Sequence, residues 1–178
     1  RGIMKQIFKP QTEWLPPESF PDLSKYDEIA IDLETKDPEL KTMGSGSVIG
    51  KSNIVGVAVA VHDWKGYYPI AHEGGGNMDK SMVIKWFQDV LNTDAVKIFH
   101  NAIYDVLWIH RLGLTVHGAV IDTMVVASLV DENRFRYDLN SVANDYVGIG
   151  KNENALQEAA KEWGVDPKSE MYKLPAMY

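Results

Sequence analysis

Two acidic residues, Asp32 and Glu34, stand two positions apart in the short segment IAIDLET. The apolar residues around them, Ile29, Ile31 and Leu33, predict a buried strand. Side chains two positions apart on a strand point to the same face, so the carboxylates would lie side by side. Two like charges in an apolar setting are unfavourable unless a cation lies between them, and Mg²⁺ or Mn²⁺ suits carboxylate oxygens. The alternative, common for a lone Asp-x-Glu, is a strand end with solvated acids.

A second pair, Asn101 and Asp105, lies downstream in KIFHNAIYDVLWI. Residues 95–99 predict a strand, Asn101 is a favourable helix N-cap, and residues 102–111 predict a helix that stops at Gly113. Side chains four positions apart share one side of a helix, and the dipole at its start favours a carboxylate. Taken alone, this pattern is more typical of an ordinary capped helix with one acid in its first turn.

The two segments together resemble a known family. Residues 32–35, DLET, are similar to the first motif of the DEDD 3′–5′ exonucleases, and residues 100–105, HNAIYD, to the second. Residues 121–123 and 136–143 resemble segments that follow the second motif in the proofreading domain of family A DNA polymerases. The tail, residues 151–178, is most similar to the bacteriophage polymerases of that family. The resemblance covers nearly the whole chain, with the motifs in the family's order and spacing.

This resemblance implies a fold, an activity, cofactors and partners. The fold would be ribonuclease H-like, an α/β fold with a mixed sheet flanked by helices. The activity would be two-metal hydrolysis of 3′-terminal phosphodiesters, with release of nucleoside 5′-monophosphates, and the cofactors two divalent ions, Mg²⁺ or Mn²⁺. The partners would be the 3′ end of single-stranded DNA and a polymerase domain of the same parent chain. The protein would be a monomer in the cytoplasm, which is the host's for a phage protein.

The resemblance also implies a role for each site residue. Asp32 would bridge both metal ions, Glu34 would join the ion that activates water, and Asp105 would hold the second ion, mostly through water. The other three site residues would serve the substrate: Thr35 and Asn101 would contact the terminal nucleotide, and Tyr104 would pack near the site.

The family's third motif, Tyr-x-x-x-Asp or His-x-x-x-x-Asp, has no match in the expected place. The chain ends at Tyr178, where related phage polymerases would reach this motif within a short further stretch. Residues 117–122 do fit His-x-x-x-x-Asp, but they precede the helix expected before the third motif, so we interpret Asp122 as a strand-end acid. The chain is therefore expected to be an impaired fragment, cut just before its last catalytic motif.

The composition is that of a globular domain. The 178 residues can bury one core, and 45% hydrophobic with 24% charged residues is ordinary. No apolar run approaches the length of a membrane span, and residues 1–10 show no signal peptide. Because the chain has no Cys, a disulfide framework and thiolate metal sites are excluded, and a reducing compartment fits.

The net charge of −7 is unfavourable for an enzyme that acts on nucleic acid, because phosphate binding favours Lys and Arg. Metal ions would offset the acids of the site, and the other domains of a polymerase would supply most of the DNA affinity. We therefore expect this chain alone to bind DNA weakly.

The domain organisation is expected to be an extended N-terminal segment, residues 1–25, and one exonuclease domain, residues 26–178, incomplete at its C-terminus. In the first segment, the Pro-rich residues 11–22 would be extended, with Trp14 and Leu15 packing back onto the domain. Early strands joined by short turns, followed by alternating strands and helices, predict a mixed sheet flanked by helices. Apolar periodicity places strands at 28–33, 53–61, 64–70, 95–99 and 120–121, and helices at 79–91, 102–111, 123–129, 138–147 and 153–163.

The polar stretch between residues 36 and 51 is expected to be a loop. Residues 44–52, GSGSVIGKS, superficially match a phosphate-binding loop, but Ser45 replaces a required Gly and a strand follows instead of a helix. A mobile loop beside the active site is the better interpretation. The His residues show no paired zinc-ligand spacing, so a zinc site is not indicated.

Three other functions stay open at this point. A free-standing DEDD exoribonuclease would carry the same carboxylates, because only contacts to the 2′-OH separate RNA from DNA. A non-catalytic module with an exonuclease fold would explain the missing fourth acid, although the intact Asp32, Glu34 and Asp105 argue against it. The least specific alternative is a metal-free α/β domain whose acids are solvated.

Overall fold

The computed structural model describes residues 12–50, 52–150 and 152–178. Residues 1–11 of the expected N-terminal segment therefore lie outside the described residues. From residue 12 to the first strand the chain forms no helix or strand. Trp14 packs back as expected, with its ring centroid 6.0 Å from that of Tyr67. The same expectation was wrong for Leu15, which is 75% exposed.

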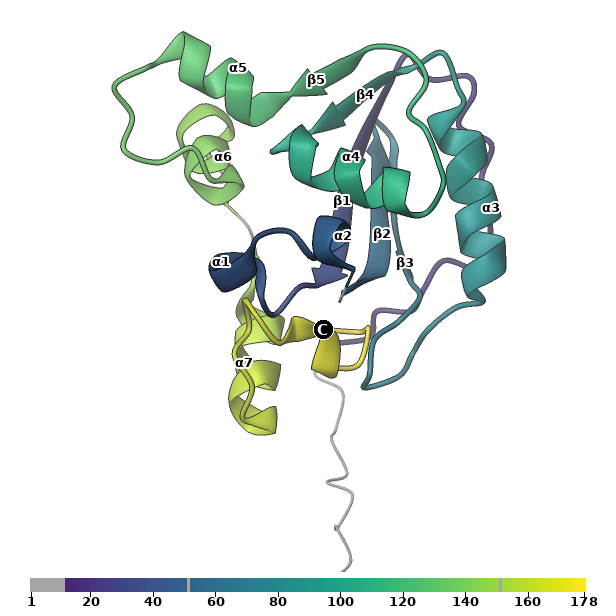
Figure 1. The fold of residues 1–178 in the computed structure, drawn as a ribbon, viewed down its shortest axis with the longest axis vertical. Helices are drawn as coiled ribbons and strands as arrows, with labels where there is room; N and C mark the ends of the chain where they lie inside the picture. Colours follow the sequence, from purple (N-terminus) through teal and green to yellow (C-terminus); the bar gives the residue numbers. More distant parts are fainter. Residues whose placement is uncertain (1–11, 51, 151) are drawn as a thin grey trace, which may run out of the picture.

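A mixed five-stranded sheet in the order β3-β2-β1-β4-β5 forms the centre of the fold (Figure 1). Strand β1 (Glu28–Lys36) pairs antiparallel with β2 (Asn53–Val61), which pairs antiparallel with β3 (Trp64–Pro69). On its other side, β1 pairs in parallel with β4 (Val96–Phe99), and β4 with β5 (Val120–Asp122). This confirms the expected mixed sheet and makes β1, which carries the first acidic pair, its central strand.

The helices follow the expected order, with small differences at their ends. The main ones are α3 (Lys80–Leu91), α4 (Ala102–Arg111), α5 (Thr123–Val130), α6 (Leu139–Val147) and α7 (Asn154–Trp163). The sequence did not predict the 3-10 turn η1 (Met171–Lys173) or two one-turn helices, α1 (Leu40–Met43) and α2 (Gly46–Ile49). No helix in the described parts of the chain is long and apolar enough to cross a membrane.

The hydrophobic core lies between one face of the sheet and helices α3 and α4. Side chains alternate along β1, so Ile29, Ile31 and Leu33 point into this core. Apolar residues of the two helices fill it from the other side: Val83, Trp86, Phe87, Val90 and Leu91 from α3, and Ala102, Trp108 and Ile109 from α4. The alternate residues of β1, including Asp32 and Glu34, therefore occupy the opposite face of the sheet.

The burial of β1 corrects one premise of the sequence argument. The strand was expected to be buried with its acids inside an apolar run, but it is buried on one face only, and Asp32 is exposed while Glu34 is half-buried. The alternation of apolar and polar residues is the pattern of a sheet with one open face. The acid that is removed from water is Asp105, on α4, rather than either acid of β1.

Helices α5 and α6 extend beyond the β5 edge of the sheet (Figure 1). Only Ala127 is buried in α5, and α6 has no buried residue. Near the C-terminus, α7 packs against the C-terminal segment through a small apolar cluster of Ala159, Ala160 and Leu174. That segment returns to the end of β1 that carries Glu34, where η1 contacts the strand.

Candidate active site

The first acidic pair lies where β1 becomes irregular. Asp32 is paired with Ala58 and Glu34 with Gly56, but Thr35 is paired with Ile54, so the register skips one residue of β2 after Glu34. The unpaired residue, Val55, belongs to β2. Thr35 lies two positions after Leu33 and so shares its face of β1, which packs against α4, where the Thr35 hydroxyl meets that of Tyr104 at 2.8 Å.

Asp105, the acid of the second segment, is joined to the first acidic pair by a hydrogen bond from a backbone amide. Asp105 lies in the first turn of α4 and is 3% exposed. Its Oδ1 accepts a hydrogen bond of 3.0 Å from the amide of Leu33, the residue between Asp32 and Glu34. The two segments singled out in the sequence are therefore joined by this hydrogen bond as well as by the Thr35–Tyr104 contact.

The start of α4 is capped in a way that the sequence did not predict. Asn101 occupies the N-cap position, but its side chain makes no capping hydrogen bond, and its φ of 70° lies in the left-handed region. The carboxylate of Asp122, at the end of β5, accepts hydrogen bonds from the amides of Asn101 (2.9 Å) and Ala102 (2.8 Å) instead. It also caps α5 by accepting from the Met124 amide at 2.9 Å. These contacts confirm Asp122 as a strand-end acid with a structural role.

The electrostatics of Asp105 show that the three acids influence one another. Burial raises the pKa of Asp105 to about 7, the charges of Asp32 and Glu34 act in the same direction, and the hydrogen bond from Leu33 opposes them. A buried carboxylate beside two others is an arrangement that a divalent cation would stabilise. A donor set of carboxylate oxygens fits Mg²⁺ or Mn²⁺. Across residues 12–50, 52–150 and 152–178, however, no three His, Cys, Asp or Glu side chains form a ready-made metal site.

A cavity of about 490 Å³ brings all six expected site residues together. Asp32, Glu34 and Thr35 come from β1, and Asn101, Tyr104 and Asp105 from the start of α4. The opposite wall consists of residues from the α1 and α7 regions and the segment that leads into η1, among them Leu40, Leu156, Pro167, Lys168 and Met171. The cavity thus combines a carboxylate floor with a wall of both apolar and polar side chains.

Asp37 is a site neighbour that the sequence analysis missed. Its carboxylate accepts hydrogen bonds from the Tyr104 hydroxyl at 3.0 Å and from the Gly46 amide at 3.0 Å. Because the Tyr104 proton is used there, the Thr35 hydroxyl donates to the Tyr104 oxygen. The segment between β1 and β2, expected to be a mobile loop, is thus tied to α4 through Asp37 and shaped into α1 and α2. No motif marks Asp37, so only its three-dimensional contacts reveal it.

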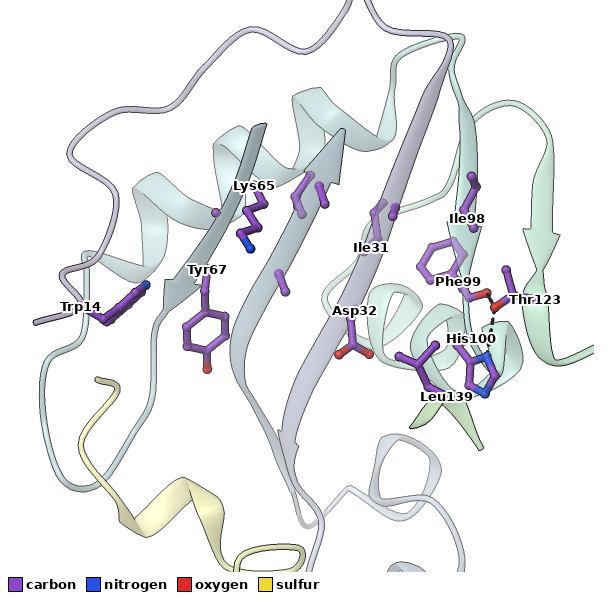
Figure 2. Close-up of a pocket in the computed structure, with 15 residues that line it drawn as sticks. Trp14, Ile31, Asp32, Lys65, Tyr67, Ile98, Phe99, His100, Thr123 and Leu139 are labelled. Atoms are coloured by element: carbon purple, nitrogen blue, oxygen red, sulfur yellow. Dashed lines mark hydrogen bonds between the residues drawn. The ribbon is translucent and has the colours of Figure 1, made fainter. Parts of the chain in front are cut away.

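A second cavity, of about 690 Å³, lies on the open face of the sheet and shares Asp32 and His100 with the first. Figure 2 shows Asp32 and Tyr67 on this face, with Trp14 beyond Tyr67 and Leu139 on the other side of Asp32. His100 is held by two contacts, one between its Nδ1 and the Thr123 hydroxyl at 2.9 Å and one from its Nε2 to the Tyr137 carbonyl at 2.7 Å. The sequence analysis gave no role to either His100 or Tyr67.

A family model and individual relatives both support the family that the sequence resembles. A family model described as "3'-5' exonuclease" matches residues 8–176. The chain is 32% identical over 178 residues to a DNA-directed DNA polymerase of Pseudomonas phage M6, covering 94% of the chain and 26% of that protein. It is 25% identical over 126 residues to DNA polymerase I of Borreliella burgdorferi, covering 70% of the chain and 13% of that protein. The chain therefore spans about a quarter or less of the length of these relatives.

Solved structures share the fold at low sequence identity. Brucella melitensis NrnC superimposes with a TM-score of 0.53 at 19% identity, over 74% of this chain and 57% of that one. Escherichia coli RNase D, an exoribonuclease involved in structured RNA processing, gives a TM-score of 0.53 at 14% identity, over 74% of this chain and 30% of that one. At these identities the likeness concerns the fold alone, and it confirms the expected ribonuclease H-like architecture.

Proposed function

Because the chain belongs to the 3′–5′ exonuclease domain family of the DEDD superfamily, we propose that it is the proofreading domain of a DNA polymerase. Its substrate would be the 3′ end of single-stranded DNA, delivered from a polymerase domain of the same parent protein. Its reaction would be hydrolysis of the 3′-terminal phosphodiester with release of a nucleoside 5′-monophosphate. The relatives named as DNA polymerases support DNA over RNA as the substrate.

The observation that carries this proposal is the hydrogen bond from the Leu33 amide to the Asp105 carboxylate. It links the first and second acidic segments so that Asp32, Glu34 and Asp105 line one cavity. After burial, the charges of Asp32 and Glu34 raise the pKa of Asp105, which reflects negative charge gathered in one pocket, and a divalent cation would relieve that repulsion.

Asp32, Glu34 and Asp105 would hold two divalent ions, Mg²⁺ or Mn²⁺. When bound, these ions would supply water activation and stabilise the leaving 3′ oxygen. A solved structure of Brucella melitensis NrnC, with a TM-score of 0.51 to this chain, is described as having bound Mg²⁺. The remaining work of the site, which is to bind and orient the DNA end, falls to the other side chains of the cavity.

The substrate contacts follow from the walls of the cavity. The Thr35 hydroxyl, which donates to Tyr104, keeps its lone pairs free to accept a hydrogen bond from the terminal nucleotide. The Asn101 side chain makes no capping bond and lines the cavity, so its amide is available to the same nucleotide. Apolar walls at Leu40, Leu156 and Met171 suit the faces of an unpaired base.

The proposal is tested by the products formed from 5′-labelled single-stranded DNA and a matched RNA in the presence of Mn²⁺. The assay uses the 178-residue chain and a longer version that continues along its gene, because the relatives are much longer than this chain. We expect a ladder of products shortened by single nucleotides on DNA, lost in both Asp32→Ala and Asp105→Asn. A ladder that survives Asp32→Ala would disprove the two-metal assignment.

The same assay separates the remaining alternatives. Faster shortening of the RNA than of the DNA would indicate an exoribonuclease. Absence of any ladder from the longer version, combined with metal-independent binding of the oligonucleotide, would indicate a non-catalytic module with an exonuclease fold. An internal cut in place of stepwise shortening would exclude an exonuclease.

A further inference from the structure

Tyr67 shares a row of the sheet with Asp32. Ala58 of β2 lies directly opposite Asp32 of β1 and opposite Tyr67 of β3, so the three side chains point to the same face. Figure 2 shows the Asp32 carboxylate and the Tyr67 ring on this face, separated by the strand that carries only small side chains between them. Nothing large on β2 therefore stands between the phenol and the acids of β1.

The Tyr67 hydroxyl reaches over β2 toward Glu34. A Cβ atom added to Gly56, the partner of Glu34, would lie 2.1 Å from the Tyr67 hydroxyl oxygen, so the hydroxyl sits directly above this glycine. After burial, the charges of Glu34 and then Asp32 are the causes that raise the pKa of Tyr67. The phenol therefore stays protonated and lies within the electrostatic influence of both carboxylates.

The proton of this hydroxyl has a fixed destination. Tyr67 Oη lies 2.6 Å from Nε2 of His72, and Nδ1 of His72 lies 3.1 Å from the carbonyl oxygen of Leu174. A carbonyl only accepts, so Nδ1 carries the imidazole proton and Nε2 accepts the one from Tyr67. Burial lowers the pKa of His72, and the hydrogen bond to Leu174 opposes this effect only in part. The lowered pKa keeps the ring neutral, so its Nε2 can accept a hydrogen bond.

The His72 ring is itself held firmly. His72 is 6% exposed, its amide donates to the Asn77 side chain at 2.7 Å, and the Asn77 amide group donates back to the His72 carbonyl at 2.8 Å. The orientation of the Tyr67 hydroxyl is therefore set by the surrounding backbone. A third cavity, of about 470 Å³, is lined by both Tyr67 and Glu34. Because the Tyr67 proton is donated to His72, the phenol oxygen offers only lone pairs to this cavity.

Lone pairs directed toward two carboxylates would be repelled unless a hydrogen-bond donor lies between them. A water molecule coordinated to a divalent cation directs its lone pair at the metal, so it acts toward its surroundings as a strong hydrogen-bond donor. We propose that Tyr67, oriented by His72, is a positioning residue that accepts a hydrogen bond from the hydration shell of a divalent cation held at Asp32 and Glu34. This inference rests on the proposed function, because it requires those carboxylates to bind the cation.

The proposed contact also couples the cation to the C-terminal segment. Leu174, which orients His72, is held there because the Ala176 amide donates to the Gly75 carbonyl at 3.1 Å and the Glu73 amide to the Tyr172 carbonyl at 2.7 Å. The packing is close, since a Cβ atom on Gly74 would lie 2.2 Å from the backbone nitrogen of Pro175. The position of this segment thereby determines how the Tyr67 oxygen faces the site.

The experiment is a titration of Mn²⁺ followed by electron paramagnetic resonance, with water-proton relaxation to measure the hydration of the bound ion. Tyr67→Phe should weaken Mn²⁺ binding about 10-fold and change the relaxation enhancement, because outer hydrogen-bond partners of metal sites typically contribute this much. Tyr68→Phe is the matched control, since the neighbouring Tyr68 points to the core face and donates to the Ser19 carbonyl. Its Mn²⁺ affinity should equal that of the wild type.

His72→Gln provides a second arm, because Gln can offer an acceptor oxygen to Tyr67 but not with the same fixed geometry. It should weaken binding less than Tyr67→Phe, and the double variant should be no weaker than Tyr67→Phe alone. Melting curves for each variant establish that the protein is folded at the titration temperature.

The outcomes separate this inference from the proposed function. Unchanged affinity in Tyr67→Phe, alongside lost affinity in Asp32→Ala, would overturn the role of Tyr67 and leave the metal site intact. Equal weakening in Tyr67→Phe and Tyr68→Phe would overturn it as well, because the effect would then come from general loosening of β3. Equal affinity in Asp32→Ala and wild type would refute the metal site of the proposed function itself, and the inference with it.

Discussion

The amide of Leu33 donates a hydrogen bond of 3.0 Å to the carboxylate of Asp105, although the two residues are 72 positions apart. Leu33 points its side chain into the core, while its neighbours Asp32 and Glu34 point to the opposite face. A backbone group of β1 therefore fixes the depth of α4 relative to the acids. This contact joins the two acidic segments and so determines where Asp105 lies relative to Asp32 and Glu34.

Metal binding should depend on Asp32 above the other acids. Asp32→Ala should weaken Mn²⁺ binding by at least about 10-fold, since a direct ligand contributes at least as much as the outer partners of a metal site. Mn²⁺ should bind more tightly than Mg²⁺, which holds its water more strongly and lies lower in the affinity order. Calorimetric titration measures both. Asp89→Ala, on the exposed side of α3, is the control and should bind like wild type.

The stability of the metal-free protein should fall as pH rises toward 8, because of Asp105. The pKa of Asp105 is raised to about 7 in the folded protein, so the folded state holds this proton more tightly than the unfolded state. The resulting stabilisation is complete below about pH 4 and is lost as the pH rises through 7.

Asp105→Asn tests this directly, because Asn keeps an oxygen acceptor for the Leu33 amide and never ionises. It should be more stable than wild type at pH 8 by about 1–3 kcal/mol, with a smaller difference at pH 5. Denaturant unfolding with a chelator at both pH values measures the effect. A difference that is the same at both would assign it to packing instead of ionisation.

Tyr104→Phe should weaken binding of single-stranded oligonucleotides about 3- to 10-fold and lower the free energy of unfolding by about 1 kcal/mol. The hydroxyl that it removes links Thr35 to Asp37, and through Asp37 it holds the loop around α2. Thr35→Val in the same background should add little, because both changes break one network. Fluorescence anisotropy measures binding, with Tyr146→Phe on α6 as an exposed control. Additive effects would show that Thr35 and Tyr104 act separately.

Asp122→Ala should lower the free energy of unfolding by about 2–4 kcal/mol, because three backbone amides at two helix starts lose their acceptor. Burial alone would raise the pKa of Asp122, but the amides of Ala102 and Asn101 hold it below its usual value. This stabilisation is present above the ordinary pKa of Asp and is lost as the pH falls through the folded value. His117→Asn, which affects an exposed pair with Asp94, should have little effect on stability. Loss of Mn²⁺ binding without loss of stability in Asp122→Ala would instead identify Asp122 as a metal ligand.

The parts of the fold that were predictable from the sequence are those decided by local patterns. Strand β2 and helix α4 have the expected bounds, because a run of β-branched residues and an amphipathic repeat each indicate one structure over their whole length. Helices α1 and α2 were not predictable, since each is a single turn that depends on the contacts of Asp37. Asn101 occupies the N-cap position of α4 as expected, but the side chain that accepts the capping hydrogen bonds is Asp122, on another strand, which no local pattern reveals.

The site was predictable only in part, for the same physical reason. Spacing placed Asp32 with Glu34 and Asn101 with Asp105, because each pair lies within one element. That the two pairs line one cavity depended on the resemblance, and the row that joins Tyr67 to Asp32 depends on the register of three strands. No property of a single segment reports on such a register.

The central position of β1 has a consequence for the order in which the protein can be built during synthesis. The hairpin pairings of β1, β2 and β3 join neighbouring parts of the chain, and they can form once residue 69 has emerged. The parallel pairing of β1 with β4 joins Glu28 to Val96, and closing so long a loop is slow and entropically unfavourable. A growing chain would thus display Asp32 and Glu34 well before Asp105 arrives beside them. The acidic pocket therefore forms late in translation, only after residue 105 has been synthesised.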